Sequence, residues 1–145
     1  MAVLSNQYAA GFFDGEGYVG IVKGKTHPKP VYTLETSLNN TSKEILDLFA
    51  QTYGGRVCAK PGGINKPLFY WYARGQKAVS FLQQVEPLLV DKKVQAWLGL
   101  EYYAQTKLYD KSGYMEALRE GFYLALRLAK NGTFAKEQEN YFGKR

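Results

Sequence analysis

The chain has 145 residues, 46% of them hydrophobic and 15% aromatic, which suits one compact domain and argues against disorder. Nineteen Lys and Arg against 13 Asp and Glu give a net charge of +6, which favours a polyanionic partner. The single cysteine, Cys58, excludes an internal disulfide and argues against a cysteine-based zinc site. With no start resembling a signal peptide and no membrane-length apolar run, we expect an intracellular protein away from membranes.

The first third of the chain predicts a helix and two strands. Ser5 can cap a helix that begins at Asn6, and the glycine-rich run 11–17 is expected to end it, because glycine is a poor helix former. Strands are expected over 18–25 and 31–38, with a loop at 26–30. Side chains of 31–38 alternate between two sets, as in a strand with one buried face.

The rest of the chain predicts a hairpin and further helices. The expected elements are a helix begun by Thr41 or Ser42 and closed by Gly54-Gly55, strands 56–60 and 68–74, and helices over 76–85, 90–107 and 112–130. Two hairpins, each followed by a helix, favour an α+β fold with an antiparallel four-stranded sheet, helices on one face and solvent on the other. We expect one domain over 1–132 and a polar tail over 133–145.

The first helix ends in the sequence Ala-Ala-Gly-Phe-Phe-Asp-Gly-Glu-Gly over residues 9–17. Gly11 and Gly15, four residues apart, share one helical face without side chains, so a second helix can approach closely. If that helix belongs to a second copy, Glu16 meets its counterpart, and two adjacent carboxylates favour a bound cation such as Mg²⁺. The alternative is a helix ending in a glycine-rich turn, with Asp14 and Glu16 as solvated caps.

This sequence resembles the LAGLIDADG signature residue by residue, except that Ala9 replaces the first Leu, Gly15 an Ala and Glu16 the last Asp. The order of strands around Asn40-Thr41-Ser42 also matches the family, over 5–107 and loosely to 132. The chain is therefore identified as a member of the single-motif LAGLIDADG homing endonucleases. The resemblance implies an αββαββα fold with a saddle-shaped sheet.

The same resemblance implies a function. One motif per chain implies a homodimer that cuts both strands of a long, pseudo-palindromic double-stranded DNA site with Mg²⁺ or Mn²⁺, Ca²⁺ giving a non-cleaving complex. The alternative is an RNA-splicing maturase, or a DNA- or RNA-binding protein of the same fold that has lost its nuclease activity.

Family likeness also assigns roles to residues. It implies catalytic roles for Glu16, Lys92 and Asn40, metal binding by Glu16 and Gly15, and a dimer interface of Ala10, Gly11, Asp14 and Gly15. Lys92 lies in a segment over 86–95 that resembles the family's lysine-bearing helix start, although an ordinary surface lysine is the alternative. Asn39 and Asn40 both qualify for the polar position after the second strand, and Asn40 is also a candidate helix cap.

The uncovered side of the sheet is expected to read DNA in the major groove. Alternation assigns to it Thr33, Glu35, Ser37 and Asn39, then Arg56, Cys58 and Lys60, then Tyr70, Tyr72 and Arg74. Lys23 and Lys25, with His27 and Lys29 in the following loop, are expected at the outer end of a half-site or along phosphates. In the fourth strand, either alternate set of residues could be the buried one, since a one-residue slip exchanges the two faces.

Overall fold

The computed structural model describes residues 3–25, 30–60, 67–107 and 113–130. Its elements are α1 (Asn6–Glu16), β1 (Gly17–Gly24), β2 (Val31–Asn40), α2 (Lys43–Tyr53), β3 (Arg56–Lys60), β4 (Leu68–Arg74), α3 (Gln76–Val85), the 3₁₀ turn η1 (Glu86–Leu88), α4 (Lys93–Lys107) and α5 (Gly113–Lys130). The predicted order of helices and strands is confirmed. The expected tail over 133–145 and most of both hairpin loops lie outside the described residues.

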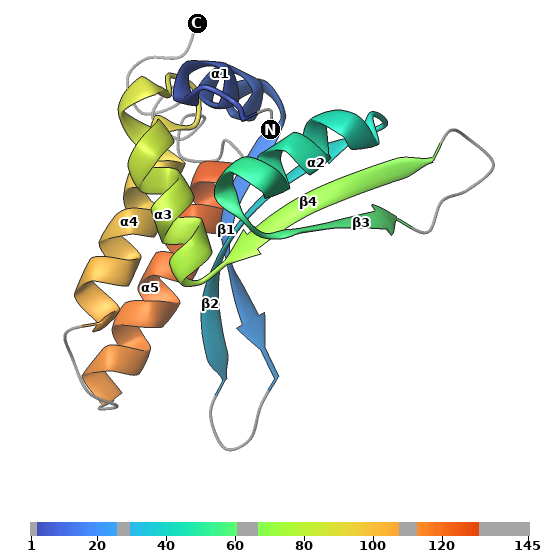
Figure 1. The fold of residues 1–145 in the computed structure, drawn as a ribbon. Helices are drawn as coiled ribbons and strands as arrows, with labels where there is room; N and C mark the ends of the chain where they lie inside the picture. Colours follow the sequence, from blue (N-terminus) through green and yellow to red (C-terminus); the bar gives the residue numbers. More distant parts are fainter. Residues whose placement is uncertain (1–2, 26–29, 61–66, 108–112, 131–145) are drawn as a thin grey trace, which may run out of the picture.

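The four strands form one antiparallel sheet in the order β1-β2-β4-β3, with β2 pairing on both sides. The two hairpins diverge, so the sheet is strongly twisted (Figure 1). Helices α1 to α4 pack against one face, and α5 packs against α4 and β1. No described helix packs over the opposite face, which we call the open face. The predicted α+β arrangement is therefore confirmed.

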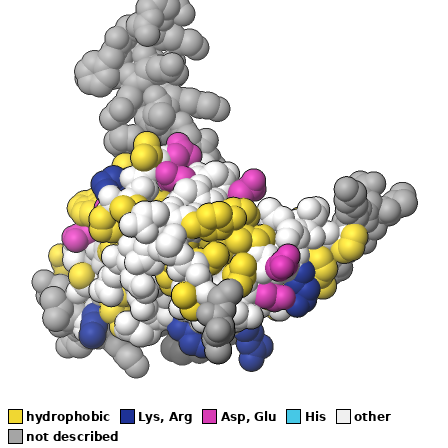
Figure 2. All heavy atoms as spheres, turned by 45° about the horizontal axis from the view of Figure 1, so that its top comes forward, with side chains coloured by type: hydrophobic (Ala, Val, Ile, Leu, Met, Phe, Trp, Pro, Cys, Tyr) yellow, Lys and Arg dark blue, Asp and Glu magenta, His cyan; other side chains and the backbone are white. Residues whose placement is uncertain are grey.

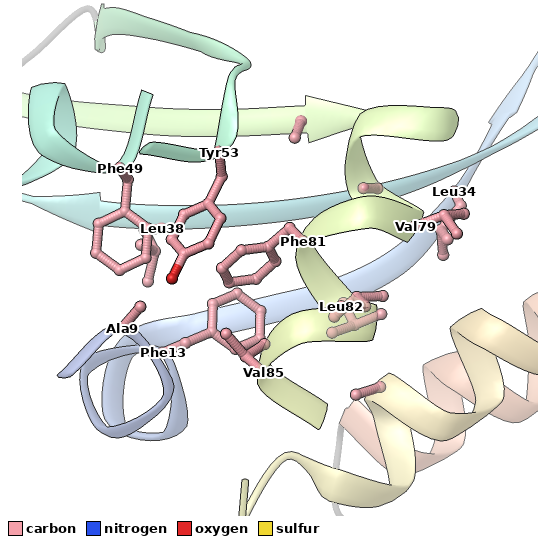
Figure 3. Close-up of a cluster of buried hydrophobic side chains, with 14 of the residues drawn as sticks. Ala9, Phe13, Leu34, Leu38, Phe49, Tyr53, Val79, Phe81, Leu82 and Val85 are labelled. Carbon is pink, nitrogen blue, oxygen red and sulfur yellow. The ribbon is translucent and has the colours of Figure 1, made fainter. Parts of the chain in front are cut away.

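The core lies between the sheet and the helices and centres on Phe81 of α3. The centre of the Phe81 ring lies 5.1 Å from that of Phe13 of α1 and 4.8 Å from that of Tyr53 of α2 (Figure 3). It lies 5.2 Å from the centre of the nearest ring of Trp71 of β4. These edge-to-face contacts suit aromatic packing. Because Trp71 is fully buried, the alternate residues of β4 must face the other way.

The N-terminal helix begins and ends where the sequence predicts. The Ser5 hydroxyl accepts a hydrogen bond from the Tyr8 amide at 3.1 Å. The glycine-rich run ends the helix only at its last residue, because α1 continues through Gly11 and Gly15 to Glu16 and Gly17 is the C-cap. Burial of Ala9, Ala10 and Phe13 along α1 outweighs the local cost of the glycines.

The fourth helix differs from its prediction in its start. It begins at Lys93 rather than Val90. Its large apolar side chains Val94 and Trp97 have 61% and 53% of their surface exposed. The buried face instead centres on Gly99, where an added Cβ would lie 3.0 Å from Leu34. Small residues let α4 approach the sheet closely, so its buried face is not its most hydrophobic one. None of the described helices is long and apolar enough to span a bilayer.

We predict that Thr36→Val stabilises the fold. Thr36 is fully buried on β2, and its hydroxyl has no hydrogen-bond partner among the described residues. Because a buried unpaired hydroxyl costs about 1–3 kcal/mol, the free energy of unfolding in urea should rise by about 1 kcal/mol. The control, Thr33→Val on the open face, should change it little. A lower free energy of unfolding for Thr36→Val would contradict the prediction.

Candidate active site and nucleic-acid interface

The end of α1 is tied to the segment before α4 by reciprocal hydrogen bonds. The Asp14 carboxylate accepts from the backbone amides of Val90 at 2.8 Å and Lys92 at 2.9 Å. In return, the Lys92 ammonium donates to the Asp14 backbone carbonyl at 2.8 Å. Lys92 is therefore held at the foot of α1, with only 18% of its side chain exposed.

These contacts also set the charge state of Asp14. Partial burial alone would raise the pKa of the Asp14 carboxyl, but three backbone hydrogen bonds, from Lys92, Val90 and Asp91, together with the Lys92 charge, hold it below its ordinary value of 3.8. Asp14 is thus ionised at neutral pH. Its carboxylate makes hydrogen bonds within the chain, and its place in a dimer interface stays a prediction.

Glu16, the last residue of α1, is exposed and has no hydrogen bond or ion pair with the described residues. Beside it lies a hollow of about 160 Å³ lined by Gly17, Tyr18, Val19, Lys92, Gln95 and Lys130. Two lysines therefore line a hollow next to a free carboxylate. Ammonium groups can bind a phosphate oxygen there, and the carboxylate can bind a cation.

A complete metal site is not present in one copy of the described chain. No group of three or more His, Cys, Asp or Glu side chains in the described ranges could hold an ion. Glu16 supplies one carboxylate, and Gly15 supplies only a main-chain carbonyl at the helix end. These oxygen donors suit Mg²⁺ or Ca²⁺, but the described residues of one copy do not complete a ligand set.

The register of β2 separates the roles of the two asparagines. Gly17 pairs with Leu38, so the residues after Leu38 run past the start of β1 towards the end of α1. The Asn40 side-chain oxygen accepts from the Ser42 amide at 2.8 Å, in the turn that begins α2. Asn40 thus stabilises the turn before α2, whose N-cap is Ser42, and its catalytic role stays a prediction. Asn39, exposed and paired with Tyr70, belongs to the open face.

Side chains of β2, β3 and β4 line the open face, and the predicted parity of these strands is confirmed. They are Thr33, Glu35, Ser37 and Asn39, Arg56, Cys58 and Lys60, and Tyr70, Tyr72 and Arg74. Glu35 pairs with Arg74 across the strands at 2.7 Å, and the Arg74 guanidinium lies 4.9 Å from the centre of the Tyr72 ring. The face therefore carries aromatic, polar and cationic groups in fixed rows.

β1 also contributes to this face, which the sequence analysis did not assign. Tyr18 pairs with Ser37 and Val22 with Thr33, and the Tyr18 ring lies over Gly20, where no side chain could fit beside it. The signal was available, because the apolar Val19 and Ile21 alternate along β1, so the residues between them face the other way.

Lys23 is not on the open face. It pairs with Tyr32, on the helix side, and its ammonium donates to Glu120 of α5 at 2.8 Å, while the Tyr32 hydroxyl donates to the same oxygen at 2.6 Å. The hydrogen bond and charge of Glu120 raise the pKa of the Lys23 ammonium. The prediction that Lys23 contacts DNA is therefore wrong in its placement. Lys25 is exposed after β1, and His27 and Lys29 lie outside the described residues.

Solved structures share this arrangement although sequence comparison does not find relatives. No protein-family model matches the sequence, and no curated protein matches it. The homing endonuclease I-CvuI, in complex with its target in the presence of calcium, superposes with a TM-score of 0.75 at 18% identity, over 86% of this chain and 80% of that chain. The archaeal intron-encoded homing endonuclease I-Vdi141I, complexed with DNA, superposes with a TM-score of 0.58 at 17% identity, over 82% of this chain and 96% of that chain.

A third similar structure is larger. The I-SmaMI LAGLIDADG homing endonuclease bound to cleaved DNA gives a TM-score of 0.63 at 14% identity, covering 88% of this chain but 43% of that one. This chain thus spans less than half of I-SmaMI but most of I-CvuI. The chain has the LAGLIDADG fold.

In this LAGLIDADG fold, α1 presents a distinct outward face. Tyr8 is 53% exposed, and a Cβ added at Gly11 or Gly15 would meet nothing within 4 Å. Ala10, by contrast, is 1% exposed and packs into the core. The prediction that Ala10 lies in a dimer interface is therefore wrong, since successive helix positions point about 100° apart.

We predict that Asp14→Ala lowers the free energy of unfolding by about 1–2 kcal/mol at neutral pH, because two backbone amides lose their acceptor. The folded-state pKa of Asp14 lies below its unfolded value, so this contribution is complete above the unfolded pKa and disappears as pH falls through the folded pKa. Urea denaturation of both proteins at neutral and acid pH measures it.

The control for this prediction is Asp47→Ala, which removes a carboxylate paired only with exposed Lys43. Its cost should stay below about 0.5 kcal/mol. Equal losses for the two variants would show that the Asp14 contacts contribute no more than a surface ion pair.

Proposed function

We propose that the chain is a homing endonuclease that cuts both strands of a specific DNA site as a homodimer, using a divalent metal ion. The observation that carries the proposal is the exposed, unpartnered Glu16 carboxylate at the foot of α1, beside a lysine fixed by Asp14. The similar I-CvuI structures hold DNA in the presence of calcium or magnesium. Their fold and ligands support the same activity here.

The open face is the proposed DNA-binding surface. A two-stranded ribbon fits the major groove, where arginine, asparagine, serine and threonine side chains distinguish base edges. The proposed contacts are Tyr18, Lys25, Thr33, Glu35, Ser37, Asn39, Arg56, Cys58, Lys60, Tyr70, Tyr72 and Arg74. Arg74 reaches this face already oriented by Glu35 and Tyr72.

The outward face of α1 is the proposed dimer interface. Figure 2 shows the molecule with its α1 end turned towards the viewer. Hydrophobic side chains gather near the middle of this surface, and charged side chains lie mostly around them. Gly11 and Gly15 let a second α1 approach closely, with Tyr8 on the same side. A twofold contact of this kind is self-complementary and brings the two Glu16 carboxylates together.

A divalent cation fits this arrangement, with Glu16, its counterpart in the second copy and the Gly15 carbonyl as oxygen donors. When bound, such an ion polarises a phosphodiester and lowers the pKa of water. Lys92, fixed by Asp14 beside the hollow, stabilises the charge that develops on the phosphate. Asn39, at the end of β2 near the foot of α1, is proposed to donate a hydrogen bond to that phosphate.

We predict that Glu16→Gln abolishes cleavage but retains DNA binding. The amide keeps the size of the side chain but loses the charge that holds the cation. The test uses duplexes that the wild-type protein selects and cuts from a randomised library in Mg²⁺, and the rate should fall at least about 10²-fold. Glu101→Gln on α4 is the control and should cut normally. Wild-type cleavage by Glu16→Gln, or no cleavage by the wild-type protein, would overturn the proposed function.

We predict that Gly11→Leu produces a folded monomer. Within one copy the new side chain meets no neighbour, and leucine favours helix over glycine by about 0.8 kcal/mol, so stability should hold or rise. Across a close helix pair it would clash. Light scattering after gel filtration measures the mass. Gly121→Leu, at an equally open glycine of α5, should leave the dimer intact. A dimeric Gly11→Leu protein would rule out this interface.

A further inference from the structure

A second hollow lies at the edge of the sheet, between β1 and the last turns of α5. It has a volume of about 270 Å³ and is lined by Tyr18, Ile21, Val22, Lys23, Tyr123, Arg127 and Lys130. β1 is an edge strand that pairs only with β2. The hollow therefore borders the open face on the side where the sheet ends.

Two cations of this hollow have no neutralising carboxylate among the residues that the structure describes. The Arg127 guanidinium donates to the Tyr123 hydroxyl at 2.9 Å, and the Lys130 ammonium lies 4.5 Å from the centre of the Tyr18 ring. Neither forms an ion pair with any described residue, whereas Lys23 in the same hollow is neutralised by Glu120. The tyrosine rings thus orient two full positive charges at the edge of the sheet.

Helix stability explains only part of this arrangement. Arg and Lys in the last turn of a helix interact favourably with its carbonyl end, which accounts for their position along α5. It does not account for their clustering with two tyrosines around a hollow. Lys130 also lines the hollow that contains Lys92, so the cations form a path from the foot of α1 to the edge of β1.

The dimensions of DNA match this position. Strands lie about 4.8 Å apart, so a four-stranded sheet is about 14 Å wide between its outer strands. The major groove is about 12 Å wide. A duplex whose major groove lies against the open face therefore places its two phosphate backbones along the outer strands, and β1 is one of these.

We propose that Tyr18, Tyr123, Arg127 and Lys130, which we call the α5 edge site, bind a backbone phosphate of double-stranded DNA. The inference rests on the proposed function and adds α5 to the DNA-binding surface. The two cations and the tyrosine hydroxyls supply hydrogen-bond donors to phosphate oxygens, and Tyr123, Arg127 and Lys130 belong to α5, beside the sheet rather than on its open face. The α5 edge site therefore adds affinity and orientation without reading sequence.

The test measures how salt weakens binding of a fluorescent duplex of arbitrary sequence, by anisotropy. Each phosphate contact contributes about 0.9 to the slope of log affinity against log salt, so Arg127→Gln/Lys130→Gln should lower the slope by about 2. The charge-retaining variant Arg127→Lys/Lys130→Arg should keep the wild-type slope. Lys77→Gln/Lys107→Gln removes the same charge from the helix side, including a lysine that lies over Tyr103, and should also keep it.

The outcomes separate this inference from the proposed function. A wild-type slope for Arg127→Gln/Lys130→Gln would overturn the α5 edge site and leave the endonuclease proposal standing. The same loss in the charge-retaining or the Lys77/Lys107 variant would overturn it as well. No salt-dependent DNA binding by the wild-type protein would overturn both. An RNA duplex of the same sequence is the second arm, and a slope change confined to RNA would refute the assignment to DNA.

Discussion

The exchange of hydrogen bonds between Asp14 and the residues before α4 is the contact on which the proposed chemistry depends. In the segment between η1 and α4, Leu89 is buried, whereas Val90 and Asp91 are exposed. The Asp14 carboxylate accepts hydrogen bonds from backbone amides of this segment, and the Lys92 ammonium donates to the Asp14 carbonyl. The last turn of α1 therefore positions Lys92 as well as Glu16. Two groups distant in sequence are thereby positioned by one local structure.

This contact requires α1 to remain helical through its glycines. Successive residues of a helix point about 100° apart, so one turn serves three directions. Phe13 points into the core, Asp14 towards α4, and Gly15 outward. Had the helix ended at the first glycine, these directions would be lost. The bulky Phe13, packed on Phe81, provides the burial that keeps the helix intact.

The secondary structure and the open face could largely be predicted from the sequence. Strand alternation depends only on the period of two, so burial of Trp71 sets the direction of Tyr70 and Tyr72. The buried face of a helix is harder to predict where it carries small residues, as at Gly99 of α4. Hydrophobicity alone would predict that Val94 and Trp97 are buried, but both are exposed. Lys23 was misplaced although it shares the parity of Val19 and Ile21, which puts it on the helix side, but its partner Glu120 could not be predicted because it lies 97 residues away. Contacts of that range leave no local pattern.

The pairing register of the sheet has a consequence for how specificity can change. Tyr18, Ser37, Tyr72 and Arg56 lie in one row across all four strands, and Glu35 is joined to Arg74 in the next. Neighbours within a row share contacts, so an exchange at one position alters the orientation of the residues beside it. In a nuclease built this way, new targets arise by replacing whole rows together, and single substitutions loosen discrimination before they redirect it.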